Sequence, residues 1–201
     1  MHLLLSGGGN PEQVIPLDKF FAEQIDRSRP VLYIPVAMEK HVYTYEQCVE
    51  WFSSTYKTFG IENVEMCTDL NKVKPLEKYT AVFIGGGNTF KLLREIKESG
   101  FDKKLTKYLN NGGFIYGGSA GAIIFGKTVK TASCFDENKV GLSDFSGLNM
   151  ANGKDIFCHY AKESDDFIND YDGEMYILYE ESGLFIENGE AKSIGEPYLQ
   201  K

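Results

Sequence analysis

The chain has 201 residues, 42% of them hydrophobic and 25% charged, which is typical of a globular protein with a substantial core. Its formal net charge of −8 argues against non-specific binding to nucleic acid or to an anionic membrane surface. The four cysteines lie far apart without a Cys-x-x-Cys pair, which disfavours a disulfide framework or a zinc site and favours reduced thiols in a cytoplasmic protein.

No apolar run approaches the length of a membrane span, and Met1–Leu5 is too short for the apolar region of a signal peptide. The chain shows no repeat, no low-complexity stretch and no obvious linker. We therefore expect one domain over residues 1–201.

Short apolar segments alternate with amphipathic ones over the first two thirds of the chain. Strands are expected at His2–Leu5, Val31–Val36, Val64–Cys67, Ala81–Ile84 and Gly113–Tyr116. Helices are expected at Leu17–Ile25 and Tyr45–Phe59, around Phe90–Ile96 and around Leu105–Leu109. This alternation predicts an α/β fold with a mostly parallel sheet and helices on both faces.

The C-terminal third has a different pattern and is predicted to be rich in strands. Ile156–His159 and Tyr176–Tyr179 have the composition of strands, with a short helix expected over Asp165–Tyr171 between them. Leu184–Ile186 and Ala191–Ile194 flank Asn188-Gly189, a dipeptide that favours the type I′ turn of a hairpin.

Three glycine-rich loops follow predicted strands. They are Ser6-Gly7-Gly8-Gly9-Asn10, Gly85-Gly86-Gly87-Asn88 and Gly117-Gly118-Ser119-Ala120-Gly121. In an open α/β sheet the ligand crevice lies beyond the carboxyl ends of the strands, so the three loops point to one site. The first lacks the Gly-x-Gly-x-x-Gly spacing, because Glu12 takes the third position, and is interpreted as a turn rather than a dinucleotide-binding loop.

Gly117 to Gly121 matches the Gly-x-Ser-x-Gly nucleophile elbow, between a strand and an apolar helix expected to begin near Ala122. Small residues two positions either side of the serine avoid steric conflict in the strained turn, and the amides that open the helix stabilise a developing oxyanion. The alternative is a tight turn in which Ser119 caps the helix. The glycines after Ile84 leave amides uncovered for a second oxyanion donor, unless this loop is only a turn capped by Asn88.

A serine nucleophile needs a base, and the chain has three histidines. His2 opens the first strand and His41 lies in a loop, whereas His159 ends a strand and can reach the same crevice. We therefore favour His159. For the acid that orients it, Asp136 and Glu180 both remain open, because triads are recognised by geometry and not by chain order.

The stretches GGGNTFKLL (Gly85–Leu93) and GGSAGA (Gly117–Ala122), together with His159, resemble the peptidase E (aspartyl dipeptidase) and cyanophycinase family of serine peptidases. The resemblance covers nearly the whole chain, in the same order and at compatible spacing. It implies a flavodoxin-like fold related to class I glutamine amidotransferases, with serine in place of cysteine at the elbow.

By this resemblance Ser119 is the nucleophile, His159 the base, and Gly87 and Ala120 supply the oxyanion amides. The stretch LYEESGLFIE (Leu178–Glu187) resembles the family segment that carries a glutamate near the active site, which favours Glu180 as the acid. Some members are assigned an aspartate between serine and histidine instead, for which Asp136 is the nearest candidate.

The implied function is hydrolysis of dipeptides or small amides through an acyl-enzyme, without a metal or organic cofactor. An esterase, another amidase and a non-catalytic relative that binds a small ligand are the alternatives. The expected partner is a small peptide substrate, with neither nucleic acid nor membrane, in a cytoplasmic protein that the resemblance makes a possible homodimer.

The interval from His159 to Glu180 bears on substrate choice. A pocket for a substrate aspartate needs a cation, best an arginine, but Lys162 is the only positive side chain in this interval. Acidic residues fill it instead: Glu163, Asp165, Asp166, Asp170, Asp172 and Glu174. If this segment borders the pocket, N-terminal aspartyl dipeptides are poor substrates, and neutral or basic ones are better.

Overall fold

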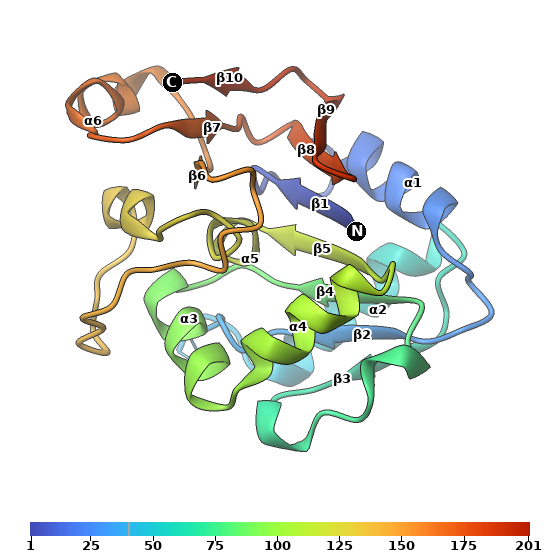
Figure 1. The fold of residues 1–201 in the computed structure, drawn as a ribbon. Coiled ribbons are helices and arrows are strands. Elements are labelled where there is room, and N and C mark those ends of the chain that lie inside the picture. The colour runs from blue at the N-terminus through green and yellow to red at the C-terminus, as the bar shows by residue number, and fades with distance from the viewer. Residues whose placement is uncertain (40) are drawn as a thin grey trace.

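A seven-stranded sheet forms the centre of the protein in this computed structural model, which describes residues 1–39 and 41–201 (Figure 1). Its strand order is β3-β2-β4-β5-β1-β8-β9. The strands are β1 (His2–Ser6), β2 (Val31–Ile34), β3 (Val64–Met66), β4 (Ala81–Ile84), β5 (Phe114–Gly118), β8 (Ser182–Glu187) and β9 (Glu190–Gly195).

The five strands from β3 to β1 in this order run parallel, and β8 and β9 add to β1 as an antiparallel hairpin. The order β3-β2-β4-β5 corresponds to the first four places of a flavodoxin-like sheet, and β1 takes the fifth place. The expected mostly parallel sheet is confirmed. The chain adds β3 on one side of β2 and then β4 on the other, so the strand order switches between β2 and β4, where such sheets open a crevice.

Alternate residues of each central strand point to opposite faces, and each face carries its own hydrophobic cluster. On β1, Leu3 and Leu5 join one cluster while Leu4 joins the other. Helices α1 (Ile15–Gln24) and α2 (Tyr45–Lys57) cover one face, and α3 (Thr89–Glu98), α4 (Phe101–Asn110) and the short α5 (Ala120–Ile123) cover the other. Both faces are therefore buried, as the continuous apolar strands predict.

The C-terminal third builds a second, three-stranded sheet of order β10-β7-β6 beside the central one (Figure 1). It consists of β6 (Asp155–Phe157), β7 (Met175–Ile177) and β10 (Leu199–Gln200), with α6 (Asp165–Asp170) between β6 and β7. The predicted β-rich end is confirmed, and so is the hairpin. Asn188 and Gly189 both have positive φ, at 51° and 85°, as a type I′ turn requires.

Within the described part of the chain, no helix is both long and apolar enough to cross a membrane. The four cysteines are free thiols, with Cys48 and Cys158 buried.

Candidate active site

Ser119 lies at the sharp turn between β5 and α5, with φ 53° and ψ −113°. A positive φ is unusual for a residue with a side chain and marks a strained turn. Among the residues that the structure describes, the other non-glycine residues with positive φ are His159 and three asparagines, a type that tolerates this conformation: Asn149, Asn152 and Asn188. Within the described chain, the only residues other than asparagine and glycine with a positive φ are therefore the predicted nucleophile and the predicted base.

The two outer glycines of the motif are required by close backbone contacts. A Cβ atom on Gly117 would lie 2.2 Å from the carbonyl oxygen of Gly121, and one on Gly121 would lie 2.2 Å from that of Ile84. Neither position can therefore take a larger residue without moving the backbone. The helix that follows starts at Ala120, earlier than the expected Ala122, and has only four residues.

Ser119, His159 and Glu180 are linked by two successive hydrogen-bond contacts. Ser119 Oγ is 2.8 Å from Nε2 of His159, and Nδ1 of His159 is 3.3 Å from Oε1 of Glu180. His159 follows β6 and Glu180 follows β7, so the C-terminal sheet brings both to the end of β5. The side chains of His159 and Glu180 are 33% and 43% exposed, and this part of the site is open to water.

Gln13 holds the glutamate from its far side. Its amide nitrogen donates to Oε2 of Glu180 at 3.0 Å and to Oε1 of Glu181 at 2.8 Å, which uses both amide protons. Its carbonyl oxygen accepts from the backbone N–H of Asn10 at 2.9 Å, and so ties the side chain to the first glycine-rich loop. No sequence pattern singles out Gln13.

The first glycine-rich loop does more than turn the chain. The N–H of Ser119 donates to the carbonyl oxygen of Ser6, and the N–H of His159 donates to that of Gly7, each at 3.1 Å. A Cβ atom on Gly8 would lie 2.8 Å from both Cβ of Ser119 and Cε1 of His159. This loop therefore contacts nucleophile and base together. The position of the loop directly after a strand indicated that it lies near the site. Its contact with Ser119 arises because β1 pairs with β5.

The second glycine-rich loop approaches Ser119 from β4. A Cβ atom on Gly86 would lie 3.3 Å from Cβ of Ser119, so Gly86, which the motif reasoning did not single out, is in contact distance. Gly87 follows it with φ 137°, where a Cβ atom would collide with the backbone of Ala37 at 2.4 Å. Within the described residues, the N–H groups of Gly87 and Ala120 donate to no protein acceptor.

The other predicted candidates lie in different surroundings. Asp136 accepts the N–H of Thr89 at 2.8 Å through Oδ2 and so caps the start of α3. His2 pairs with Glu187 at 3.1 Å. His41 is exposed in the loop that leads to α2. The structure therefore brings Glu180, and not Asp136, into hydrogen-bond distance of His159.

The model of peptidase family S51 matches residues 2–196 of the chain. The chain belongs to peptidase family S51. The predicted resemblance to the peptidase E family is thereby confirmed.

Peptidase E of Shigella flexneri serotype 5b is 29% identical over 153 residues, which cover 74% of this chain and 64% of that protein. The chain thus spans less than two thirds of the length of this relative. An uncharacterized peptidase of Listeria monocytogenes is 27% identical over 192 residues, covering 89% of this chain and 92% of that protein.

Two solved structures share the fold. A candidate peptidase E protein from Listeria monocytogenes EGD-e superposes with a TM-score of 0.79 at 24% identity, over 98% of each chain. A peptidase from an acI-B1 actinobacterium gives a TM-score of 0.69 at 14% identity, over 100% of this chain and 93% of the other. At these identities the likeness concerns the fold alone.

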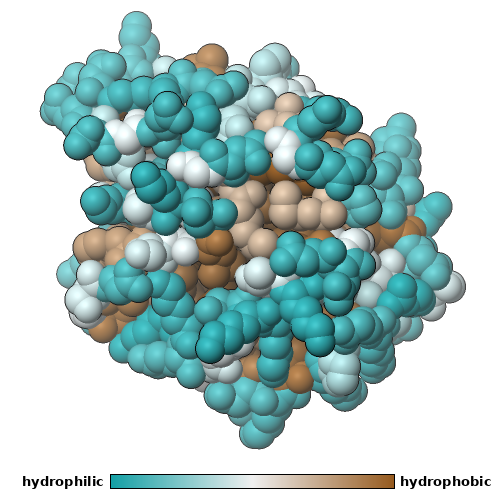
Figure 2. Space-filling model, viewed as in Figure 1, coloured by the Kyte–Doolittle hydropathy of each residue, from teal (hydrophilic) through white to brown (hydrophobic). Residues whose placement is uncertain are grey.

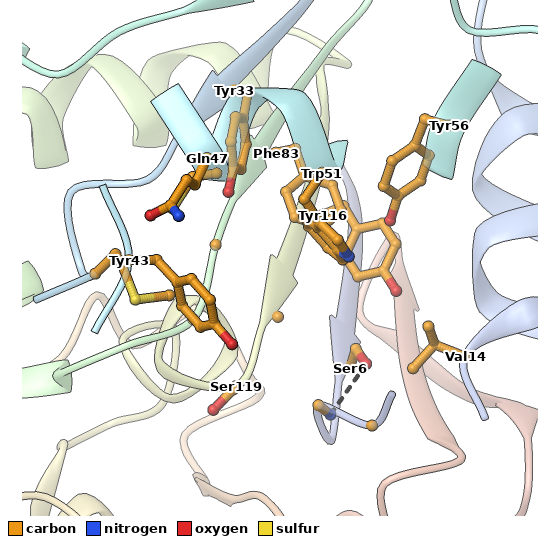
Figure 3. Close-up of a pocket in the computed structure, with 17 residues that line it drawn as sticks. Ser6, Val14, Tyr33, Tyr43, Gln47, Trp51, Tyr56, Phe83, Tyr116 and Ser119 are labelled. Atoms are coloured by element: carbon orange, nitrogen blue, oxygen red, sulfur yellow. Dashed lines mark hydrogen bonds between the residues drawn. The ribbon is translucent and has the colours of Figure 1, made fainter. Parts of the chain in front are cut away.

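Beside Ser119, this S51 chain has a cavity of about 450 Å³ (Figure 3). Its lining comes from β1, β2, β4, β5 and α2 and from the loops beside them, and aromatic side chains dominate its wall. They are Tyr33, Tyr43, Trp51, Tyr56, Phe83 and Tyr116. Glycines 8, 9, 85, 86 and 118 complete the wall next to Ser119. In the space-filling view, apolar surface shows through between teal side chains near the middle of the molecule (Figure 2).

Asp18 lies behind two of these aromatic residues. It is 1% exposed, and its Oδ1 accepts the hydroxyl protons of Tyr56 at 2.7 Å and Tyr116 at 3.1 Å. Burial raises the pKa of Asp18 to about 6, although the two hydroxyl bonds act in the opposite direction. Burial also raises the pKa of both tyrosines, which therefore remain neutral donors.

Proposed function

We propose that the chain is a serine peptidase that hydrolyses dipeptides or small amides through an acyl-enzyme, with Ser119 as nucleophile, His159 as base and Glu180 as the acid. The observation that carries this proposal is the continuous contact from Ser119 Oγ through the imidazole to Glu180. Membership of family S51 supports it.

The contacts favour one tautomer of His159. An ionised carboxylate only accepts hydrogen bonds, so Nδ1 carries the proton toward Glu180 and Nε2 is left to accept the proton of Ser119. In the proposed reaction Ser119 Oγ attacks the carbonyl carbon while its proton moves to Nε2. The imidazolium, stabilised by Glu180, then protonates the leaving amine as the C–N bond breaks.

Water completes the cycle. His159 takes a proton from the water as its oxygen attacks the ester carbonyl, and returns that proton to Ser119 Oγ as the acyl group leaves. The free N–H groups of Gly87 and Ala120 are the proposed oxyanion donors, one from each glycine-rich loop beside Ser119. With α5 only four residues long, we assign this stabilisation to the local amides and not to a helix dipole.

Labelling by a fluorophosphonate probe tests the assignment. The parent protein is expected to be labelled on Ser119, and Ser119→Ala is expected to remain unlabelled while it keeps the same circular dichroism spectrum. Peptide and aryl-ester substrates assayed side by side then separate a peptidase from an esterase or another amidase. A parent protein that takes no label would favour the non-catalytic alternative. A cytoplasmic location and a homodimer stay predictions.

A further inference from the structure

The described lining of the cavity beside Ser119 offers no charged side chain with which to recognise a charged substrate. Among the residues that the structure describes, its lining contains no Asp, Glu, Lys, Arg or His. The sequence-based expectation depended on the acidic interval between His159 and Glu180 bordering the pocket, and none of the acidic residues of that interval lines this cavity. The physical basis for substrate choice is therefore the aromatic wall and not repulsion by surface carboxylates.

Three polar groups of the wall already have hydrogen-bond partners within the protein. The hydroxyls of Tyr56 and Tyr116 both donate to Asp18, and the amide oxygen of Gln47 accepts the N–H of Thr44. A substrate carboxylate would lose its water without gaining a cation from the described lining, and Asp18, which bonds to Tyr56 and Tyr116 of the wall, would repel it. A substrate ammonium would also be desolvated without a carboxylate on the lining.

The cavity lies on one side of the reacting bond. His159 protonates the leaving amine in the proposed reaction, so the leaving group must lie next to the imidazole. Ser119 lines the cavity and His159 does not. The cavity therefore lies on the acyl side, where the residue whose carbonyl is attacked places its side chain.

The size of the cavity is suited to a bulky substrate side chain. The volume of about 450 Å³ falls within the range of roughly 300–1,000 Å³ of small-molecule sites. Trp51 and Tyr43, which are 44% and 55% exposed, stand at the mouth, and Figure 3 shows the Tyr43 hydroxyl directed toward Ser119. Phe83 and Tyr116 come from the adjacent strands β4 and β5 and offer ring faces and edges to an aromatic guest.

We infer that this cavity selects an uncharged aromatic or bulky apolar side chain on the acyl residue, so that dipeptides with N-terminal Phe, Tyr, Trp or Leu are the preferred substrates. This inference rests on the proposed peptidase function. Burial of an aromatic ring and exclusion of charge together are expected to favour Phe-Ala over Asp-Ala and Lys-Ala by about 100-fold in kcat/KM.

The experiment measures kcat/KM for Phe-Ala, Leu-Ala, Ala-Ala, Asp-Ala and Lys-Ala with the parent protein and with Cys48→Leu. Cys48 lines the cavity, so the larger side chain occupies part of it and is expected to lower the Phe-Ala to Ala-Ala ratio about tenfold. Cys67→Leu, a cysteine outside the lining, is the matched control and is expected to keep the parent ratio. Trp51→Ala, a change at the exposed mouth, is expected to lower the same ratio and serves if Cys48→Leu does not fold.

The outcomes separate the two proposals. A preference for Asp-Ala or Lys-Ala, equal rates across the panel, or an unchanged ratio in the cavity variants would overturn the inference while leaving the peptidase assignment intact. A protein that hydrolyses none of the peptides and takes no fluorophosphonate label would overturn both.

Discussion

The two sides of Ser119 are built in different ways. On one side, His159, Glu180 and Gln13 are partly exposed polar side chains on loops. Hydrogen bonds join His159 and Gln13 to the first glycine-rich loop, and Gln13 in turn holds Glu180. On the other side, aromatic side chains from β2, β4, β5 and α2 belong to the buried core and form the cavity. The difference teaches that the two proposals rest on separate parts of the molecule: the proposed chemistry on the polar side, and the inferred substrate selection on the aromatic side.

The largest effect is expected from the nucleophile. Ser119→Ala should lower kcat/KM for any substrate by about 10,000-fold or more, because no other hydroxyl takes the place of Oγ beside the base. The measurement is steady-state kinetics with circular dichroism as the control for folding. Near-parental turnover in the alanine variant would remove Ser119 from the mechanism.

A similar loss is expected for the base. His159→Ala should be about as damaging as Ser119→Ala, since the two groups act as one unit. His41→Ala is the matched control, because His41 is an exposed loop residue, and should keep parental activity. If the two results were reversed, the base would be His41.

The next largest loss of activity is expected from replacing the acid. Glu180→Gln should lower kcat by about 1,000-fold, because an amide does not stabilise the imidazolium formed during attack. Asp136→Asn should lower kcat much less and act mainly through the capping contact with Thr89. Rates of the two variants decide between the candidates, and a greater loss with Asp136→Asn would transfer the role.

On the aromatic side, Asp18 is expected to make the stability of the folded protein depend on pH. Since burial raises the pKa of Asp18 from 3.8 to about 6, the folded protein binds this proton more tightly than the unfolded chain. The contribution of protonated Asp18 to the free energy of unfolding is complete below about pH 4 and is lost as the pH rises through about 6. A difference of roughly two pKa units corresponds to about 3 kcal/mol.

Asp18→Asn tests this dependence, because its amide oxygen can accept both tyrosine hydroxyls without titrating. Urea unfolding of the two proteins from pH 4 to pH 8 should show the parent losing stability relative to the variant across this window. Parallel curves would contradict the shifted pKa of Asp18.

The smallest of these effects concerns Gln13 as a positioning residue. Gln13→Glu replaces the donor to Glu180 and Glu181 by a third carboxylate, and should lower kcat about tenfold. The added negative charge should also move the acidic limb of the kcat/KM profile to higher pH, which a merely structural role would not do. Gln13→Met lowers kcat without that shift. An unshifted profile in the glutamate variant would show that Gln13 does not act through Glu180.

Most of the parallel sheet could be predicted from the sequence, because its strands are short and mostly apolar, and glycine marks the ends of β1, β4 and β5. The strained Gly-x-Ser-x-Gly turn was equally clear, because its close backbone contacts require glycine at 117 and 121 and so leave a local signature in the sequence. The contact of Glu180 with His159 depends on how the C-terminal sheet sits against β1, and spacing along the chain holds no information about that. The contacts of Gly8 and the shape of the aromatic cavity likewise depend on how distant segments pack together. In the sequence alone, Tyr56 and Phe83 cannot be told from other core residues.

The strained backbone at Ser119 has a consequence for how the protein can change. With φ at 53°, a residue with a Cβ atom is held in a conformation that glycine adopts freely. Ser119→Gly should therefore unfold about 1 kcal/mol less readily than Ser119→Ala, though both lack a nucleophile. Selection for stability alone would favour loss of the whole side chain at this turn, so a more stable but inactive variant lies one substitution away.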